Sequence, residues 1–148
     1  MSSDKNLISQ AQILCERKKE RLTKPRLEVL KIMTQTDGPV GAYEILHKLK
    51  DILNSPNPPT VYRAIDFWLQ MGFIHRIESL NAYVLCHSNH NHRGSQFIIC
   101  DDCGSATEVH LDNMAQSVEQ SSSQSNFSCS TWSLEIHGQC GSCRSALV

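Results

Sequence analysis

The stretch HRIESLNAYVLCHSNHNHRGSQFIICDDCGSATE, residues 75–108, separates two parts of the chain that differ in pattern. It is rich in side chains that bind metals, and no comparable set precedes it: His75, Cys86, His87, His90, His92, Cys100, Cys103 and Glu108. Upstream, apolar residues recur at helical spacing among basic residues. Downstream, β-prone segments lead to a second cysteine pair, Cys140-Gly-Ser-Cys143. We therefore expect metal bound in this stretch to control how the upstream part meets its partner.

Charge is distributed unevenly along the chain, although the 148 residues carry a net charge of only −1. Residues 1–80 hold twelve Lys and Arg against nine Asp and Glu, a net of +3, and residues 81–148 hold two against six, a net of −4. A basic half joined to an acidic half is typical of a nucleic-acid reader fused to another module. The alternative is chance asymmetry.

No signal peptide is visible at the N-terminus, because Asp4, Lys5, Glu16 and Arg17 interrupt any apolar run. No stretch is long enough to span a bilayer, so we expect a cytoplasmic protein without a membrane partner. The chain contains seven cysteines. In a reducing compartment, CxxC pairs more often bind metal or do redox work than belong to a disulfide framework.

The first half reads as a series of helices followed by a β-hairpin. Apolar spacing and capping residues predict helices over residues 6–21, from the N-cap Thr23 to about Thr34, over 42–53, and from about Thr60 to Gly72. Two β-prone segments follow, at 73–77 and 82–86, with a turn at 79–81. This order predicts a winged helix-turn-helix, whose last helix enters the major groove of DNA. The alternative is a helical core with an exposed polar face.

Candidate DNA contacts lie on two of these helices. Arg63, on the polar side of the last helix, is suited to guanine O6 and N7, and Tyr62 beside it to a thymine methyl or a phosphate. Lys24 and Arg26 belong to a basic cluster at the start of the second helix, where backbone N–H groups also favour phosphate. Such clusters are often only solvated faces.

The second half reads as a small β/α module. We expect strands at 96–100, 107–111 and 130–137, a helix from 111 to about 120, and a flexible Ser-rich loop at 121–126. The fold class is therefore α+β, with an N-terminal winged helix-turn-helix and a C-terminal α/β domain. The boundaries that we expect are residues 1–78 for the winged helix, 79–86 for a hinge region and 87–148 for the second domain.

The two CxxC pairs are the strongest chemical signal in the sequence. Each pair places two thiolates on one turn, and Cys100, Cys103, Cys140 and Cys143 together complete a tetrahedral zinc site with no open position. Such a site adds folding energy to a module with a modest core. A redox dithiol is the alternative. It is disfavoured because no basic neighbour stabilises a thiolate and because Asp101 and Asp102 oppose one.

A looser second set of metal ligands surrounds the first pair. His75, Cys86, Glu108 and a His of the 87–92 loop offer nitrogen, sulfur and oxygen ligands, a combination suited to an exchangeable zinc ion. Each of them also has a plain explanation as a surface or strand residue. A metal held by all four would clamp the two halves of the chain, as a sensor biased by its ligand requires.

Seven short motifs resemble the ferric uptake regulator family and, within it, the zinc uptake regulators. They are Leu22-Thr-Lys-Pro-Arg26, Ala42-Tyr-Glu-Ile-Leu46, Pro59-Thr-Val-Tyr-Arg-Ala64, Gly72-Phe-Ile-His75, Tyr83-Val-Leu-Cys-His87, Phe97-Ile-Ile-Cys-Asp-Asp-Cys-Gly104 and His137-Gly-Gln-Cys-Gly-Ser-Cys143. The resemblance extends from about residue 7 to residue 144. It implies a homodimeric, metal-dependent repressor whose C-terminal domain mediates dimerisation.

The resemblance also implies roles for individual residues. The four cysteines of the CxxC pairs match the structural zinc site. His75, Cys86 and Glu108 match the regulatory zinc site, with His92 as the fourth ligand or His90 in its place. Tyr43, Tyr62 and Arg63 match the DNA contacts. Iron and peroxide sensors of the family carry a His in the turn that here holds Gly38 and Pro39, and another where this chain has Trp132, so neither signal is favoured.

The sequence therefore predicts a zinc-responsive repressor with about two zinc ions per chain, one structural and one regulatory. It would bind double-stranded operator DNA as a homodimer when zinc is plentiful and control zinc-uptake genes, with no small organic substrate. A sensor of iron, manganese, nickel or peroxide is the alternative within the family. A zinc-dependent hydrolase or deaminase is the alternative of another class, but neither HExxH nor the deaminase signature is present, so we expect no enzyme.

Overall fold

Helices dominate the first half of the chain and strands the second. The computed structural model describes residues 2–87 and 94–145, which divide into two units, residues 1–86 and 87–148. Residues 79–86, expected as a hinge region, belong to the first unit. Motion about them stays a prediction. Within the described ranges, every helix is too short or too polar to cross a lipid bilayer.

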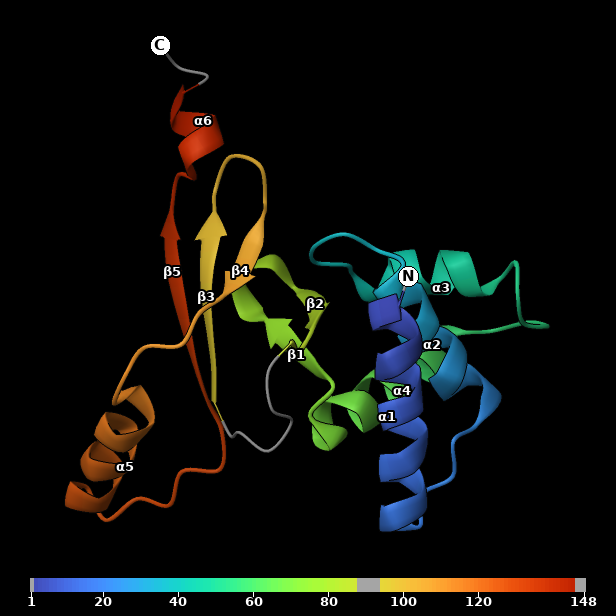
Figure 1. Cartoon of the computed structure of the whole chain (residues 1–148), viewed down its shortest axis with the longest axis horizontal. Helices are drawn as coiled ribbons and strands as arrows, with labels where there is room; N and C mark the ends of the chain where they lie inside the picture. The colour runs from blue at the N-terminus through green and yellow to red at the C-terminus, as the bar shows by residue number, and fades with distance from the viewer. Residues whose placement is uncertain (1, 88–93, 146–148) are drawn as a thin grey trace. The chain divides into compact units, whose positions relative to one another are not determined.

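The first unit is a winged helix-turn-helix. Its four helices precede a two-stranded antiparallel wing with a short 3-10 turn, η1, between the strands (Figure 1). The bounds are α1 Ser2–Lys18, α2 Lys24–Thr34, α3 Ala42–Leu49, α4 Pro58–Met71, β1 Ile74–Ile77, η1 Glu78–Leu80 and β2 Ala82–Leu85. A bridge between Val40 and Tyr83 ties the wing to the segment before α3.

Local chemistry sets the ends of these helices. The Thr23 hydroxyl accepts a hydrogen bond from the backbone N–H of Arg26 and caps α2, as the sequence predicts. The side chain of Asn57 caps α4 in the same way, accepting from the backbone N–H and the hydroxyl of Thr60 at 3.1 and 2.9 Å. Gly72 ends α4 with φ +80°, a left-handed conformation that glycine adopts without strain.

Trp68 occupies the centre of the core of the first unit. Its side chain is fully buried, with edge-on ring contacts to Phe67 and Phe73 at centroid distances of 4.8 and 5.4 Å. The indole N–H donates to the backbone carbonyl of Arg26 at 2.8 Å, which joins α4 to the first turn of α2. Helix α4 therefore has one face fixed in the core and leaves the opposite face for a partner.

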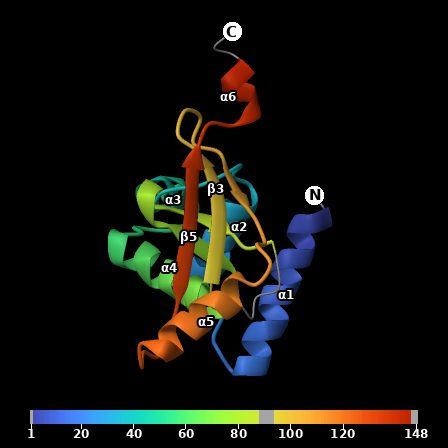
Figure 2. The same ribbon diagram turned by 90° about the vertical axis from the view of Figure 1, so that its left-hand side faces the viewer.

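The second unit is a three-stranded sheet with two helices. Its strand order is β4-β3-β5, with β3 antiparallel to β4 and parallel to β5 (Figure 1). Helix α5 lies at the end of the sheet where β3 and β5 begin, and α6 at the other end (Figures 1 and 2). The bounds are β3 Gly94–Cys100, β4 Ala106–Glu108, α5 Met114–Gln124, β5 Trp132–Gly138 and α6 Gly141–Ser145.

Several boundaries differ from those expected. The first helix ends at Lys18 rather than residue 21, because Lys19 adopts φ +56°. The prediction of a loop at 121–126 is wrong for its first four residues, which extend α5. There the Ser122 hydroxyl donates to the Val118 carbonyl at 2.8 Å, and serine disfavours helix by only a few tenths of a kcal/mol relative to alanine. The sequence gives no signal for α6.

The cap of α4 provides a test of the first unit. Asn57→Ala removes the acceptor for Thr60 and should lower the free energy of unfolding by about 1 kcal/mol, whereas Asn57→Asp should preserve stability. Urea unfolding of the full chain, followed by circular dichroism, measures this. Asn54→Ala is the matched control, since Asn54 is exposed and its side chain makes no hydrogen bond within the described part of the chain. Equal unfolding midpoints for the two alanine variants would contradict the assigned cap.

Candidate metal centres and nucleic-acid interface

Four thiols meet at one end of the sheet in the second unit. The sulfur atoms of Cys100, Cys103, Cys140 and Cys143 lie within 4.8 Å of one another, and those of Cys103 and Cys140 are 3.9 Å apart. A tetrahedral zinc ion with Zn–S bonds of about 2.3 Å would separate its sulfurs by about 3.8 Å. The four thiols that the sequence singles out are therefore brought together, at the spacing that zinc requires.

The first CxxC turn is shaped by its backbone. The N–H of Gly104 donates to the carbonyl of Cys100, and the N–H of Cys100 donates to the carbonyl of Ser105, both at 2.9 Å. Gly104 has φ +73°, so the turn needs a residue that tolerates the left-handed region. The chain thereby reverses between β3 and β4 and holds Cys100 and Cys103 on one side of the turn.

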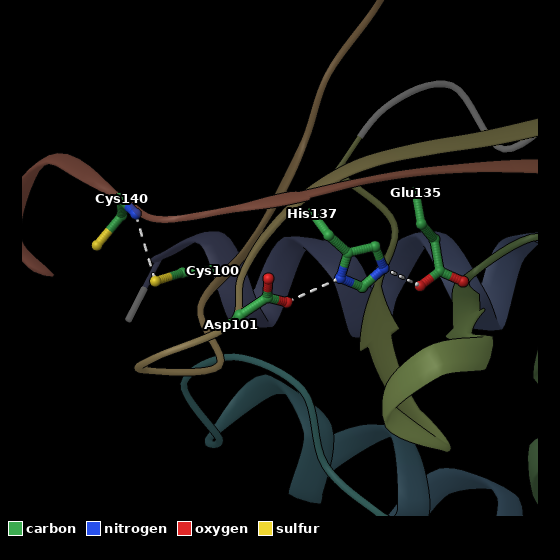
Figure 3. Close-up of polar contacts among 5 residues, drawn as sticks. All are labelled: Cys100, Asp101, Glu135, His137 and Cys140. Carbon is green, nitrogen blue, oxygen red and sulfur yellow. Dashed lines mark hydrogen bonds and ion pairs between the residues drawn. The ribbon is translucent and has the colours of Figure 1, made fainter. Parts of the chain in front are cut away.

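The second pair arrives through the parallel pairing of β3 and β5. The register sets Cys100 opposite Gly138, and the N–H of Asp101 donates to the Gly138 carbonyl at 2.8 Å. Two residues later, the N–H of Cys140 donates to the sulfur of Cys100 at 3.3 Å (Figure 3). Helix α6 begins at the next residue, Gly141, and places Cys143 in its first turn.

Backbone donors stabilise a thiolate at this site. Hydrogen bonds from backbone N–H groups, chiefly that of Cys103 and then that of Cys140, lower the pKa of Cys100 to about 6. The Ser105 hydroxyl lowers the pKa of Cys103, whereas hydrogen bonding among the thiols raises that of Cys143. The sequence considers only basic neighbours and does not show these backbone donors, because it does not reveal where N–H groups point. A stabilised thiolate also suits metal binding, since protons compete less with the ion.

Three further side chains around the thiols were not expected from the sequence. His137 lies between two carboxylates, with Nδ1 3.0 Å from Asp101 and Nε2 3.3 Å from Glu135 (Figure 3). The hydrogen bond to Asp101 is the main cause of a raised pKa for His137, and Glu135 adds to it. Gln139 donates from its amide to the Asp102 carboxylate. The only sequence signal for these contacts is that the five residues lie inside the first cysteine pair or within five positions before the second.

A second pair of candidate ligands lies on the wing of the first unit. The register pairs His75 with Val84, and the N–H of Cys86 donates to Phe73 at 2.8 Å, so His75 and Cys86 are diagonal neighbours on one face of the hairpin. A ring nitrogen of His75 and the sulfur of Cys86 lie within 4.8 Å. Ligand atoms on one tetrahedral zinc are about 3.5 Å apart, so small side-chain rotations would bring both onto one ion.

The other expected ligands belong to the second unit. Glu108 ends β4, is partly buried, and accepts a hydrogen bond from the backbone N–H of His87 at 3.3 Å. His90 and His92 lie outside the described residues. The regulatory ligand set, including the choice between these two histidines, therefore stays a prediction.

The exposed side of α4 carries the side chains expected to contact DNA. Tyr62 and Arg63 are exposed, whereas Val61, Ala64 and Ile65 are buried, so the helix is divided as its spacing predicts. Tyr43 stands at the start of α3 and is 72% exposed. These three side chains are free to meet a partner, and base contact by them stays a prediction.

Lys24 and Arg26 differ in their surroundings. Lys24 is exposed at the first residue of α2. Arg26 is partly buried, with its guanidinium 3.8 Å from the centre of the Phe67 ring and a hydrogen bond to the Arg21 carbonyl. Arg26 therefore helps to fasten α2 to α4, a role that the sequence did not indicate. Phosphate contact by either residue stays a prediction.

Comparison with known proteins assigns the fold to a family of metal-dependent regulators. The model of the Ferric uptake regulator family matches residues 17–137, and the chain belongs to that family. It is similar to the Zinc uptake regulation protein of Escherichia coli (strain K12), with 38% identity over 96% of this chain and 84% of the relative. The family predicted from the sequence motifs is thus confirmed.

Two solved structures extend the similarity to the fold. A zinc uptake regulator complexed with zinc and DNA is 36% identical, covers 99% of both chains and has a TM-score of 0.91. The holo form of a protein named XcZur is 34% identical, covers 95% of this chain and 98% of its own, and has a TM-score of 0.84. The predicted α+β fold class, with a winged helix before a cysteine-bearing α/β domain, is confirmed.

The thiol cluster makes a direct prediction for metal content. Cys103→Ser removes one of four ligands, so the tightly held zinc of the purified protein should fall from one ion per chain to nearly none. Cys129→Ser is the matched control, because that thiol lies outside the cluster and donates a hydrogen bond to the Thr131 carbonyl. Elemental analysis after mild chelation measures both. Retention of a full zinc ion by Cys103→Ser would show that the four thiols do not form one site.

Proposed function

We propose that this protein is a zinc-responsive transcriptional repressor of zinc-uptake genes. The observation that carries the proposal is the pairing of His75 with Cys86 on the wing, in a chain similar over nearly its whole length to a zinc uptake regulation protein. A thiolate is a soft ligand, which favours zinc over manganese. A sensor of iron would gain little metal affinity from the thiolate of Cys86. The site therefore favours zinc as the signal.

The two metal sites have different tasks in this proposal. Cys100, Cys103, Cys140 and Cys143 hold a structural zinc ion with no open position, which stabilises the second unit and stays bound. His75, Cys86, Glu108 and His92, or His90 in its place, hold a regulatory zinc that exchanges with its surroundings. About two zinc ions per chain follow, and neither acts on a substrate.

The regulatory zinc acts by coupling metal binding to DNA binding. Two of its ligands come from the DNA-reading unit and two from residues 87–148, so an ion bound to all four would restrict how the first unit is presented. A coupling free energy of about 1–3 kcal/mol changes the affinity for DNA by about 5- to 150-fold, which is enough for a switch. Zinc scarcity would then release the operator.

A homodimer bound to double-stranded operator DNA is the assembly that we propose. The second unit exposes apolar side chains on neighbouring strands, since Ile98 of β3 pairs in register with Ile136 of β5 and they are 47% and 40% exposed. Phe127 is 66% exposed. Apolar surface of this kind is typical of a protein–protein interface. Two copies would place two α4 helices on a pseudo-palindromic site.

The proposal excludes an enzymatic role. Both candidate sites would be filled by four protein ligands, which leaves no position for the water molecule that a zinc hydrolase or deaminase activates. Regulation of transcription also places the protein in the cytoplasm, with DNA and a second copy of the chain as its partners.

Cys86 provides the sharpest test of the regulatory site. Cys86→Ser should abolish the dependence of DNA binding on zinc, while the protein keeps its fold and one tightly held zinc. Binding is measured on duplexes selected from a random pool by the zinc-loaded wild type, with and without added zinc. Cys129→Ser, a serine substitution outside both sites, should behave as the wild type. Unchanged zinc dependence in Cys86→Ser would overturn the assignment of the sensor.

Arg63 provides a test of the DNA-reading face. Arg63→Ala should weaken binding to the selected duplexes by about 1–3 kcal/mol and relax the preference for guanine at one position of each half-site. Arg144→Ala makes the same charge change in the second unit and should leave that preference intact. An equal, sequence-independent loss of affinity in both variants would mean that Arg63 contributes only general charge.

A further inference from the structure

The two residues inside the first CxxC pair both face the strand that leads to the second pair. The Asp101 carboxylate contacts Nδ1 of His137 at 3.0 Å (Figure 3). The Asp102 carboxylate accepts a hydrogen bond from the amide of Gln139. From the sequence, these two aspartates are expected only to oppose a thiolate. In the structure they link the first CxxC turn to His137 and Gln139, shortly before Cys140.

These contacts continue the sheet beyond its last paired residues. The pairing of β3 and β5 ends where Cys100 lies opposite Gly138. Beyond that point the backbone N–H of Asp101 still reaches the Gly138 carbonyl, and the Asp102 carboxylate contacts Gln139. The Asp101 carboxylate instead reaches back to His137, which pairs with Ile99 inside the ladder. The first CxxC turn and β5 are therefore joined at the cysteine end of the sheet by protein contacts, independently of a metal ion.

His137 is held from both sides of its ring. Nε2 lies 3.3 Å from Glu135, two residues earlier on the same face of β5, while Nδ1 contacts Asp101. Carboxylate oxygens accept hydrogen bonds, so a ring nitrogen that donates to one of them is held toward it. Rotation of the ring would break both contacts, which makes His137 a rigid link between the turn and the strand.

The charges also favour this arrangement. A zinc ion with four thiolate ligands carries a net of two negative charges, so two free carboxylates on the same turn would repel it. Asp101 and Asp102 instead face hydrogen-bonding groups of His137 and Gln139. The two aspartates thereby hold the first CxxC turn against the strand segment before Cys140. Their electrostatic repulsion of the thiolates is also reduced.

We propose that Asp101 with His137, and Asp102 with Gln139, form a latch that positions the two cysteine pairs for zinc and slows its release. The latch rests on the proposed structural zinc site and assigns positioning roles to four residues that are not ligands. Without it, the two cysteine pairs, separated by 36 residues, are joined at this end by the β3–β5 ladder, two hydrogen bonds of backbone N–H groups and the metal. Outer contacts of this kind change metal affinity by about 10- to 100-fold in other proteins.

The experiment compares zinc release from full-length variants. Each carries Cys86→Ser, so that only the structural zinc remains, and release to a colorimetric chelator is timed. Asp101→Ala and His137→Ala should release zinc about 10- to 100-fold faster than the parent. Asp112→Ala and His110→Ala are matched controls, because both side chains are exposed and make no hydrogen bond or ion pair in the described part of the second unit. They should release zinc at the parental rate.

Two further measurements separate positioning from general damage to the fold. Asp101→Ala combined with His137→Ala should be no worse than either alone, because the two residues act through one contact. His137→Asn, whose amide places a donor near the position of Nδ1, should recover most of the slow release. Cobalt substituted for zinc should show the thiolate charge-transfer absorption of a tetrahedral site in the parent, and a weaker, altered band in Asp101→Ala.

The outcomes distinguish the latch from the site on which it depends. If the Cys86→Ser parent holds no zinc, the proposed structural site is wrong and the latch falls with it. If the parent holds zinc but the latch variants release it at the rate of the controls, the site stands and the latch is overturned. Additive effects of the two alanine substitutions, or no recovery in His137→Asn, would likewise overturn it. Faster release, non-additivity and recovery together support it.

Discussion

The parallel pairing of β3 with β5 is the constraint on which the second unit depends. It sets Cys100 opposite Gly138 and so delivers two cysteine pairs, 36 residues apart along the chain, to one end of the sheet. A parallel pair needs a long crossover, which β4 and α5 supply. The helices of this unit bury no residue, so the sheet and the proposed zinc ion must provide much of the stability.

Register has a corresponding role in the first unit. The hairpin pairs His75 with Val84, which puts Cys86 on the same face and within reach of the same ion. Strand β1, which carries His75, follows α4 directly, with only Gly72 and Phe73 between the two elements. The exposed face of α4 carries Tyr62 and Arg63. The proposed metal ligand His75 and the proposed DNA-reading helix are therefore neighbours along the chain, which would give metal binding a short path to the proposed DNA-binding surface.

Local chemistry explains why much of this could be predicted from sequence. Thr23, Gly72 and the CxxC spacing each specify a geometry within a few residues, and their predicted roles agree with the structure. The contact of His137 with Asp101, 36 positions away, and the lowered pKa of Cys100 depend on register and on the direction of backbone N–H groups. No local pattern encodes either one, so they emerge only from the folded chain.

The central claim is that one zinc ion builds the fold while another controls DNA binding. Stepwise chelation of the zinc-loaded wild type tests it directly, with zinc content and affinity for the selected duplexes followed in the same samples. The account predicts that DNA affinity is lost with the first zinc per chain, while the second zinc and the circular dichroism spectrum remain. Affinity that persists until the last zinc and the fold are lost together would contradict it.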